Sequence, residues 1–89
     1  EQGGHRPALV LSPKSYNGKS GLFICCPITS KVKNYPFEVP LPEGLAVAGV
    51  ILADQVKSLD WQERDAQFIA SVPDNVIKQV LAKLNTLLR

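Results

Sequence analysis

Polar side chains stand at the ends of two apolar, strand-forming runs, residues 8–11 and 22–28. They are Glu1, His5 and Arg6 before the first run, and Thr29 and Ser30 after the second. If the two runs pair as neighbouring antiparallel strands, the start of one lies beside the end of the other. The sequence therefore predicts that Arg6 and Thr29 share one edge of a sheet.

This grouping suits the cleavage of RNA without a metal ion. That reaction uses the ribose 2′-OH as nucleophile, and it needs a donor for the charge that develops on the phosphate and a proton for the leaving oxygen. The planar fork of Arg6 fits phosphate through two parallel hydrogen bonds. Because arginine stays protonated at neutral pH, Arg6 suits the role of acid, and His5 or Glu1 is better suited to accept a proton.

These residues also have a purely structural interpretation. An arginine before a strand is often a solvated strand end or part of a surface ion pair, and a threonine after a strand is often an ordinary loop hydroxyl. Neighbouring residues of a strand point to opposite faces, so His5 and Arg6 need not share a site. Residue types and spacing alone thus leave both interpretations open.

The net charge is modest, so the positions of the cations matter more than their number. Ten Lys and Arg against eight Asp and Glu give a formal charge of +2, which is too small to indicate general nucleic-acid binding. Lys31 and Lys33 either form a solvated loop or, beside Tyr35 and Phe37, hold a single nucleic-acid strand by charge and stacking.

Length and composition indicate one small domain over residues 1–89 that uses no metal or other cofactor. The 89 residues are 45% hydrophobic and 20% charged, and a chain this short gains from a partner subunit that completes its core.

Cys25 and Cys26 are adjacent in a strand and point to opposite faces, which excludes a disulfide, and one histidine is too few for a zinc site. No run approaches the ~18 apolar residues of a membrane span and no signal peptide is evident, so we expect a cytoplasmic protein without membrane contact.

Breaker residues and periodicity predict about five strands and one closing helix. Strands are expected at residues 8–11, 22–28, 35–41, 46–52 and 56–59, with residues 67–72 as one more short strand. Two prolines make residues 35–41 an edge or bulged strand. Loops are expected at residues 14–21 and 29–34, and a tight connection at residues 53–55. From Pro73 onward, apolar side chains recur at helical spacing, which predicts an amphipathic helix packed on the sheet or on a partner.

Three stretches, GHRPALVLSP, PITSKVKNYPFEV and LADQVKSLDW, together resemble the MazF family of bacterial toxin endoribonucleases, the mRNA interferases of toxin–antitoxin pairs. The resemblance covers the whole chain in order and extends more distantly to the Kid and CcdB superfamily. It implies an SH3-like small barrel of strongly bent antiparallel strands plus a C-terminal helix, assembled as a homodimer. Family members usually begin with a further strand that is absent here, and the chain has no methionine, so we expect an N-terminally incomplete MazF-like domain.

The resemblance also implies roles for particular residues. It makes Arg6 and Thr29 catalytic, with Glu1 and His5 as supporting candidates. It implies RNA contact for a further group, which comprises Ser30, Lys31, Lys33, Asn34, Tyr35 and Gln55.

The function implied is sequence-specific, ribosome-independent and metal-independent cleavage of single-stranded mRNA, which inhibits translation and growth. The implied partner is a MazE-like antitoxin whose acidic C-terminal tail covers the RNA groove. The alternative on the same barrel is a CcdB-like toxin that binds and poisons DNA gyrase without catalysis. Such a poison has no need of an arginine–threonine pair at a strand-end cleft.

Overall fold

The computed structural model describes residues 6–88. Within them, the fold is built around one long strand. That strand is β2 (Leu22–Thr29). The other strands are β1 (Ala8–Val10), β3 (Glu38–Pro40), β4 (Val50–Leu52) and β5 (Lys57–Asp60). Strand β1 runs antiparallel along one side of β2, β5 and then β4 run antiparallel along the other, and β3 pairs with the far side of β4.

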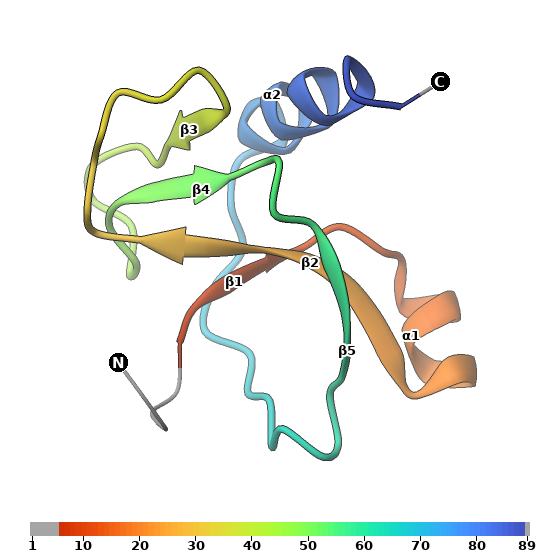
Figure 1. The fold of residues 1–89 in the computed structure, drawn as a ribbon. Coiled ribbons are helices and arrows are strands. Elements are labelled where there is room, and N and C mark those ends of the chain that lie inside the picture. Colours follow the sequence, from red (N-terminus) through yellow and green to blue (C-terminus); the bar gives the residue numbers. More distant parts are fainter. Residues whose placement is uncertain (1–5, 89) are drawn as a thin grey trace.

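Strand β2 bends because it belongs to two sheets at once (Figure 1). Its first half pairs with β5, with Cys25 opposite Lys57, whereas its end pairs with β4, with Thr29 opposite Val50. The result is a small, open and strongly bent antiparallel sheet, which agrees with the predicted barrel-like fold. Strand β3 ends the order β1-β2-β4-β3, so the prediction of an edge strand from its prolines is confirmed.

The helix predicted from Pro73 is present as α2 (Asp74–Asn85) and packs on the sheet of its own chain (Figure 1). Val76 and Val80 are its buried side chains. The core cluster comprises Leu9, Cys26, Val39, Leu41, Ile51, Ala53, Val76 and Val80. Cys25 and Cys26 are buried free thiols, which confirms the prediction that they form no disulfide. Neither α2 nor any other helix within residues 6–88 has the length and apolar character to span a bilayer.

The predicted loop at residues 14–21 is wrong, because most of it forms the short helix α1 (Lys14–Ser20). The Asn17–Gly18 pair makes no hairpin turn here. Asn17 instead exchanges side-chain hydrogen bonds with Ser12, and its carbonyl accepts a 2.9 Å hydrogen bond from the Trp61 indole. Gly21 ends the helix in the left-handed conformation that helix C-termini favour. Tertiary contacts thus impose a helix on residues of weak helical propensity.

The additional strand predicted at residues 67–72 is also wrong. The segment forms no strand and pairs with none of the five strands in the described part of the chain. Phe68 is 83% exposed and Ile69 is 58% exposed. Apolar β-formers produce a strand only where a neighbouring strand supplies hydrogen bonds, and within residues 6–88 this segment has no such neighbour.

Candidate active site

The pairing of β1 with β2 brings Arg6 and Thr29 to the same edge of the sheet. Ala8 lies opposite Pro27, and the Ile28 N–H donates a 3.1 Å hydrogen bond to the Pro7 carbonyl. Continued by two residues, this register sets Arg6 across from Thr29. Arg6 is exposed and Thr29 is half-buried, so a solvent-borne phosphate can reach both. Glu1 and His5, the supporting candidates, lie outside the described residues.

A glycine packed against the backbone of Thr29 fixes the end of β2. Gly49 has a φ of +122°, and a Cβ added there would lie 2.2 Å from the Thr29 carbonyl oxygen. Only glycine permits this close approach, which allows Thr29 to pair with Val50 at the bend. The Thr29 hydroxyl oxygen accepts a 3.1 Å hydrogen bond from the Lys31 N–H. Because the oxygen is used as an acceptor, the hydroxyl proton stays available for another group.

Thr29 lies in the wall of a groove of about 550 Å³, a volume typical of ligand sites. Its lining also contains five of the six residues that the resemblance assigned to RNA contact. The lining residues are Thr29, Lys31, Lys33, Asn34, Tyr35, Pro36, Glu38, Leu52, Asp54 and Gln55. The sixth residue, Ser30, is exposed beside Thr29 but is not part of the lining.

The loop that carries the two lysines is held by contacts with β3 and α2. The Glu38 carboxylate accepts hydrogen bonds from the backbone N–H groups of Lys33, at 3.0 Å, and Asn34, at 3.1 Å. Asn34 has a φ of +58°, a conformation that asparagine tolerates better than most residues. The Lys83 ammonium of α2 donates a 2.7 Å hydrogen bond to the Pro36 carbonyl. These contacts give the loop a defined shape although its side chains are exposed.

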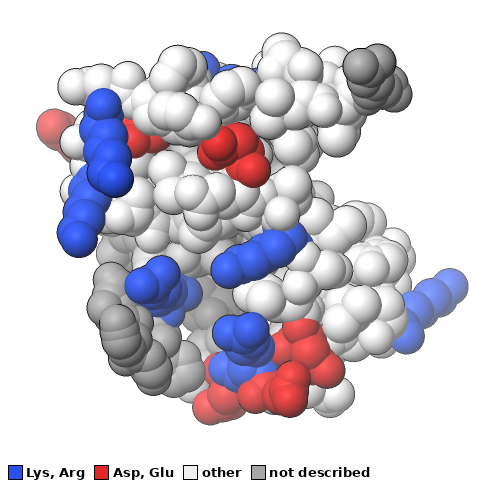
Figure 2. Space-filling model, in the orientation of Figure 1, with Lys and Arg blue, Asp and Glu red and all other residues white. Residues whose placement is uncertain are grey.

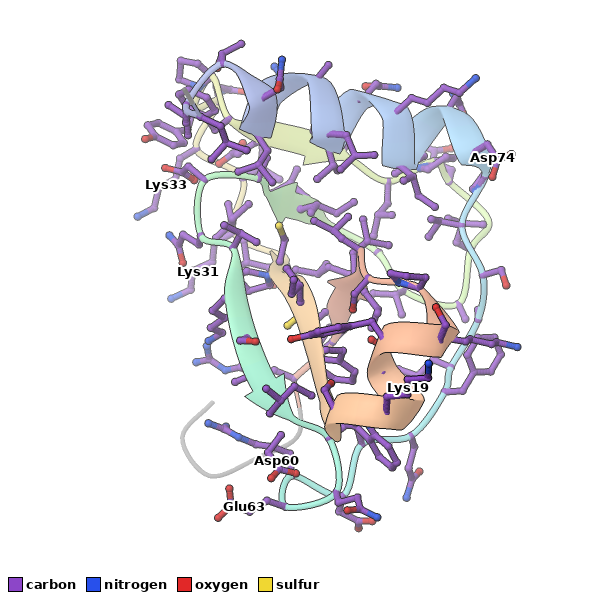
Figure 3. All side chains as sticks on the ribbon, turned by 90° about the vertical axis from the view of Figure 1, so that its right-hand side faces the viewer. Lys19, Lys31, Lys33, Asp60, Glu63 and Asp74 are labelled. Carbon is purple, nitrogen blue, oxygen red and sulfur yellow. The ribbon has the colours of Figure 1, made fainter. Side chains whose placement is uncertain are left out.

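Positive charge on this edge comes from side chains near the groove. Figure 3 shows Lys31 and Lys33 on one edge of the molecule, near the end of α2 that is remote from Asp74. In Figure 2, blue side chains spread over the face, and red ones lie both in its upper part and in a group at its lower edge, over the turn that follows β5. The groove thus offers two cations, Lys31 and Lys33, to an anionic strand, beside the carboxylates of Glu38 and Asp54.

Tyr35 and Asp54 form a hydrogen-bonded pair in the groove wall. The Tyr35 hydroxyl donates to the Asp54 Oδ2 atom at 2.8 Å, and this hydrogen bond, with the negative charge of the carboxylate, raises the pKa of the Tyr35 phenol. The rings of Tyr35 and Phe37 are tilted against each other with centroids 5.8 Å apart. Tyr35 is 47% exposed, so its ring offers a surface for stacking.

Sequence reasoning missed two acidic residues of this groove. Glu38 had no sequence signal, because its role depends on a loop conformation that brings two backbone N–H groups to one carboxylate. Asp54 did have a sequence signal, since it closely follows the apolar run that becomes β4, just as Thr29 follows the apolar run that becomes β2. Within residues 6–88 no three His, Cys, Asp or Glu side chains are grouped so that they could hold a metal ion.

Comparisons with known proteins agree with this fold. A family model described as a PemK-like, MazF-like toxin of type II toxin–antitoxin systems matches residues 1–88. The endoribonuclease toxin MazF of Escherichia coli K12 is 49% identical over 88 residues, which cover 99% of this chain and 78% of that protein. The endoribonuclease PemK of Escherichia coli is 32% identical over 92 residues, which cover 99% of this chain and 69% of that protein.

Solved structures give the same result. A crystal structure of MazE–MazF from Deinococcus radiodurans aligns with a TM-score of 0.94 at 56% identity, covering 97% of this chain and 84% of that one. A mycobacterial endoribonuclease in complex with its cognate antitoxin, at 20% identity and a TM-score of 0.81, shares the fold. These matches define the class of protein as a small bacterial toxin built on a bent antiparallel sheet.

The chain belongs to the PemK-like, MazF-like toxin family of type II toxin–antitoxin systems. The relatives that match it are endoribonucleases by name. Membership therefore supports RNA cleavage over the CcdB-like alternative of a toxin that poisons DNA gyrase by binding alone.

Proposed function

We propose that this toxin endoribonuclease cleaves single-stranded mRNA, at a short sequence and without the ribosome, at the sheet edge that carries Arg6 and Thr29. The observation that carries the proposal is the β1–β2 register, in which Ala8 lies opposite Pro27 and which, continued by two residues, would set Arg6 opposite Thr29. Thr29 in turn lines a groove with two lysines. A phosphate bound at this edge would meet a cation, a hydroxyl and a track for the flanking strand.

In the proposed reaction the ribose 2′-oxygen attacks the adjacent phosphorus and the bond to the 5′-oxygen breaks. Arg6 binds the phosphate, stabilises its developing charge and donates the proton that the leaving 5′-oxygen takes. The Thr29 hydroxyl donates its free proton to a phosphate oxygen or to the attacking oxygen. The 2′-OH proton passes to a base, for which His5 and Glu1 remain the candidates. The products are a 2′,3′-cyclic phosphate and a 5′-hydroxyl, and no step uses a metal ion or other cofactor.

The groove is proposed to hold the RNA strand beside the scissile phosphate. Lys31 and Lys33 neutralise phosphates, and the exposed ring of Tyr35 stacks on a base. Ser30, Asn34 and Gln55 supply hydrogen bonds to bases or sugars. These last three residues are exposed and follow Thr29 or line the groove.

We also propose a MazE-like antitoxin as partner, with an acidic C-terminal tail that competes with RNA for the two lysines. The similarity of this chain to the Deinococcus MazE–MazF structure supports this partner. We propose a homodimer as well, because exposed apolar side chains lie on α2, with Leu81 at 46% exposure, and directly after it, with Leu87 at 49% and Leu88 at 62%. Residues 1–89 would form one toxin domain, acting in the cytoplasm, where its mRNA substrate is translated.

Two variants of the sheet edge test the proposed catalytic roles. Arg6→Ala removes the phosphate ligand and Thr29→Val removes only the hydroxyl, and each is expected to lower kcat on a long synthetic RNA about a hundredfold to a thousandfold. Lys19→Ala is the charge-matched control, because Lys19 lies on α1, away from Lys31 and Lys33 (Figure 3). Near-normal cleavage by Arg6→Ala, with the fold intact by circular dichroism, would show that Arg6 is only a solvated strand end.

A further inference from the structure

Asp54 has a carboxylate oxygen that the folded chain leaves without a partner. Its Oδ2 atom accepts the Tyr35 hydroxyl at 2.8 Å. Its Oδ1 atom is buried and has no hydrogen-bond partner among the residues described. A buried carboxylate oxygen without a donor is unfavourable, because it has lost its water without replacement. A ligand bound in the groove could supply the missing donor.

The position of Asp54 limits which ligand group can reach it. Asp54 lines the same groove as Thr29, together with Lys31 and Gln55. In the proposed function this groove holds RNA, whose phosphates and carbonyl oxygens are acceptors and are repelled by a carboxylate. The available donors are sugar hydroxyls and the N–H groups of bases. Adenine, cytosine and guanine carry an exocyclic amino group, whereas uracil presents one ring N–H between two carbonyl oxygens.

Tyr35 is hydrogen-bonded to this carboxylate and lines the same groove, so a base that approaches Asp54 meets the Tyr35 side chain. Its hydroxyl is already bonded to Asp54, and its ring is 47% exposed. Exposed side chains reorient at low cost, since they lose little packing. A base that enters the groove can therefore stack on the ring while its edge meets the carboxylate. The hydrogen bond to Asp54 raises the pKa of the Tyr35 phenol.

We infer that Asp54 is a specificity-determining residue that accepts a hydrogen bond from the exocyclic amino group of an RNA base bound in the groove beside Thr29. The inference rests on the proposed function, because it requires RNA in this groove. It goes beyond it by naming the chemical feature that the protein reads. One position of the cleavage site must then hold a base with an amino group, and uracil is disfavoured there.

The test removes the amino group and the carboxylate separately and together. The cleaved sequence is first mapped with wild-type protein on a long synthetic RNA. In a short RNA of that sequence, each base is then replaced by its analogue without the amino group: purine for adenine, 2-pyrimidinone for cytosine and hypoxanthine for guanine. The kcat/KM of wild type and Asp54→Ala is measured on every RNA. Glu63→Gln, which also removes one negative charge but lies at the opposite end of the molecule (Figure 3), is the control.

We expect one position at which loss of the amino group lowers kcat/KM of wild type and of Glu63→Gln about tenfold to a hundredfold. Asp54→Ala should lose less than about threefold on the same change, since its acceptor is already gone. Equal losses for wild type and Asp54→Ala at every position, or no loss at any, would overturn the inference while leaving RNA cleavage established. Failure of wild type to cut unmodified RNA would overturn the proposed function, and this inference with it.

Discussion

Replacement of Gly49 by alanine is expected to displace the strand end that carries Thr29. The new Cβ would lie 2.2 Å from the Thr29 carbonyl oxygen, whereas real Cβ contacts are not shorter than 3.0 Å, so the atoms must separate by at least 0.8 Å. Alanine at a φ of +122° adds a backbone cost of about 1–3 kcal/mol. Both effects fall on the bend of β2, where Thr29 pairs with Val50.

Gly44→Ala separates these two effects. Gly44 has a φ of +91°, and a Cβ added there meets nothing within 4 Å. This control is expected to lower the free energy of unfolding by about 1–2 kcal/mol and to keep normal RNA cleavage. Gly49→Ala is expected to lose more stability, and its kcat/KM should fall about a hundredfold, a typical effect of a 1 Å misplacement near a reacting group.

Urea unfolding and RNA cleavage kinetics measure the two effects on the same preparations. The reasoning requires Gly49→Ala to unfold at a lower urea concentration than Gly44→Ala, and to cut RNA more slowly under conditions where both variants are folded. If the two variants have the same urea midpoint and the same kcat/KM, the close approach of Gly49 does not determine the position of Thr29.

Three further measurements probe the core and the groove. Burial, and to a smaller extent the charges of neighbouring groups, raises the pKa of the Cys26 thiol from its ordinary value of 9.0 to about 11. The thiol therefore ionises at lower pH in the unfolded chain than in the folded one. As a result, the free energy of unfolding should fall more between pH 9 and 11 in wild type than in Cys26→Ala. An equal fall in both proteins would contradict this. The Asp54 hydrogen bond is the main cause of the raised pKa of Tyr35, so Asp54→Ala should lower that pKa in a titration of phenolate absorbance, and an unchanged titration would show that the pair does not persist in solution. Lys33→Ala should reduce the slope of log Kd against log salt by about 0.7, measured by fluorescence anisotropy with an RNA that has 2′-deoxyribose at the cleavage site. Lys19→Ala should leave that slope unchanged. Equal slopes for the two variants would show that Lys33 does not contact a phosphate.

The part of the site that depends on strand ends could be predicted from the sequence. Two apolar runs with polar residues at their ends suffice to bring Arg6 and Thr29 to one edge, because antiparallel pairing is a local rule with few alternatives. The register of β1 and β2 agrees with that expectation. The closing helix was also predictable, since helical periodicity identifies the buried side chains Val76 and Val80.

Features that depend on contacts between distant segments could not be predicted in this way. Helix α1 is stabilised by the Trp61 indole, which lies 44 residues beyond its acceptor Asn17. The groove joins the loop after β2 to Asp54, and its shape requires Gly49 to touch Thr29. None of these contacts has a short-range sequence signal, because each partner is an ordinary residue until the fold brings the two together.

The ends of the cleaved RNA test the central claim most directly. Wild-type protein is incubated with a synthetic RNA in excess chelator, and the termini of the fragments are identified by mass spectrometry. Attack by the 2′-oxygen predicts a 2′,3′-cyclic phosphate and a 5′-hydroxyl, with no cut where the ribose before the scissile phosphate is replaced by 2′-deoxyribose. Fragments that carry a 5′-phosphate, or cleavage of the deoxy-substituted site, would contradict the mechanism.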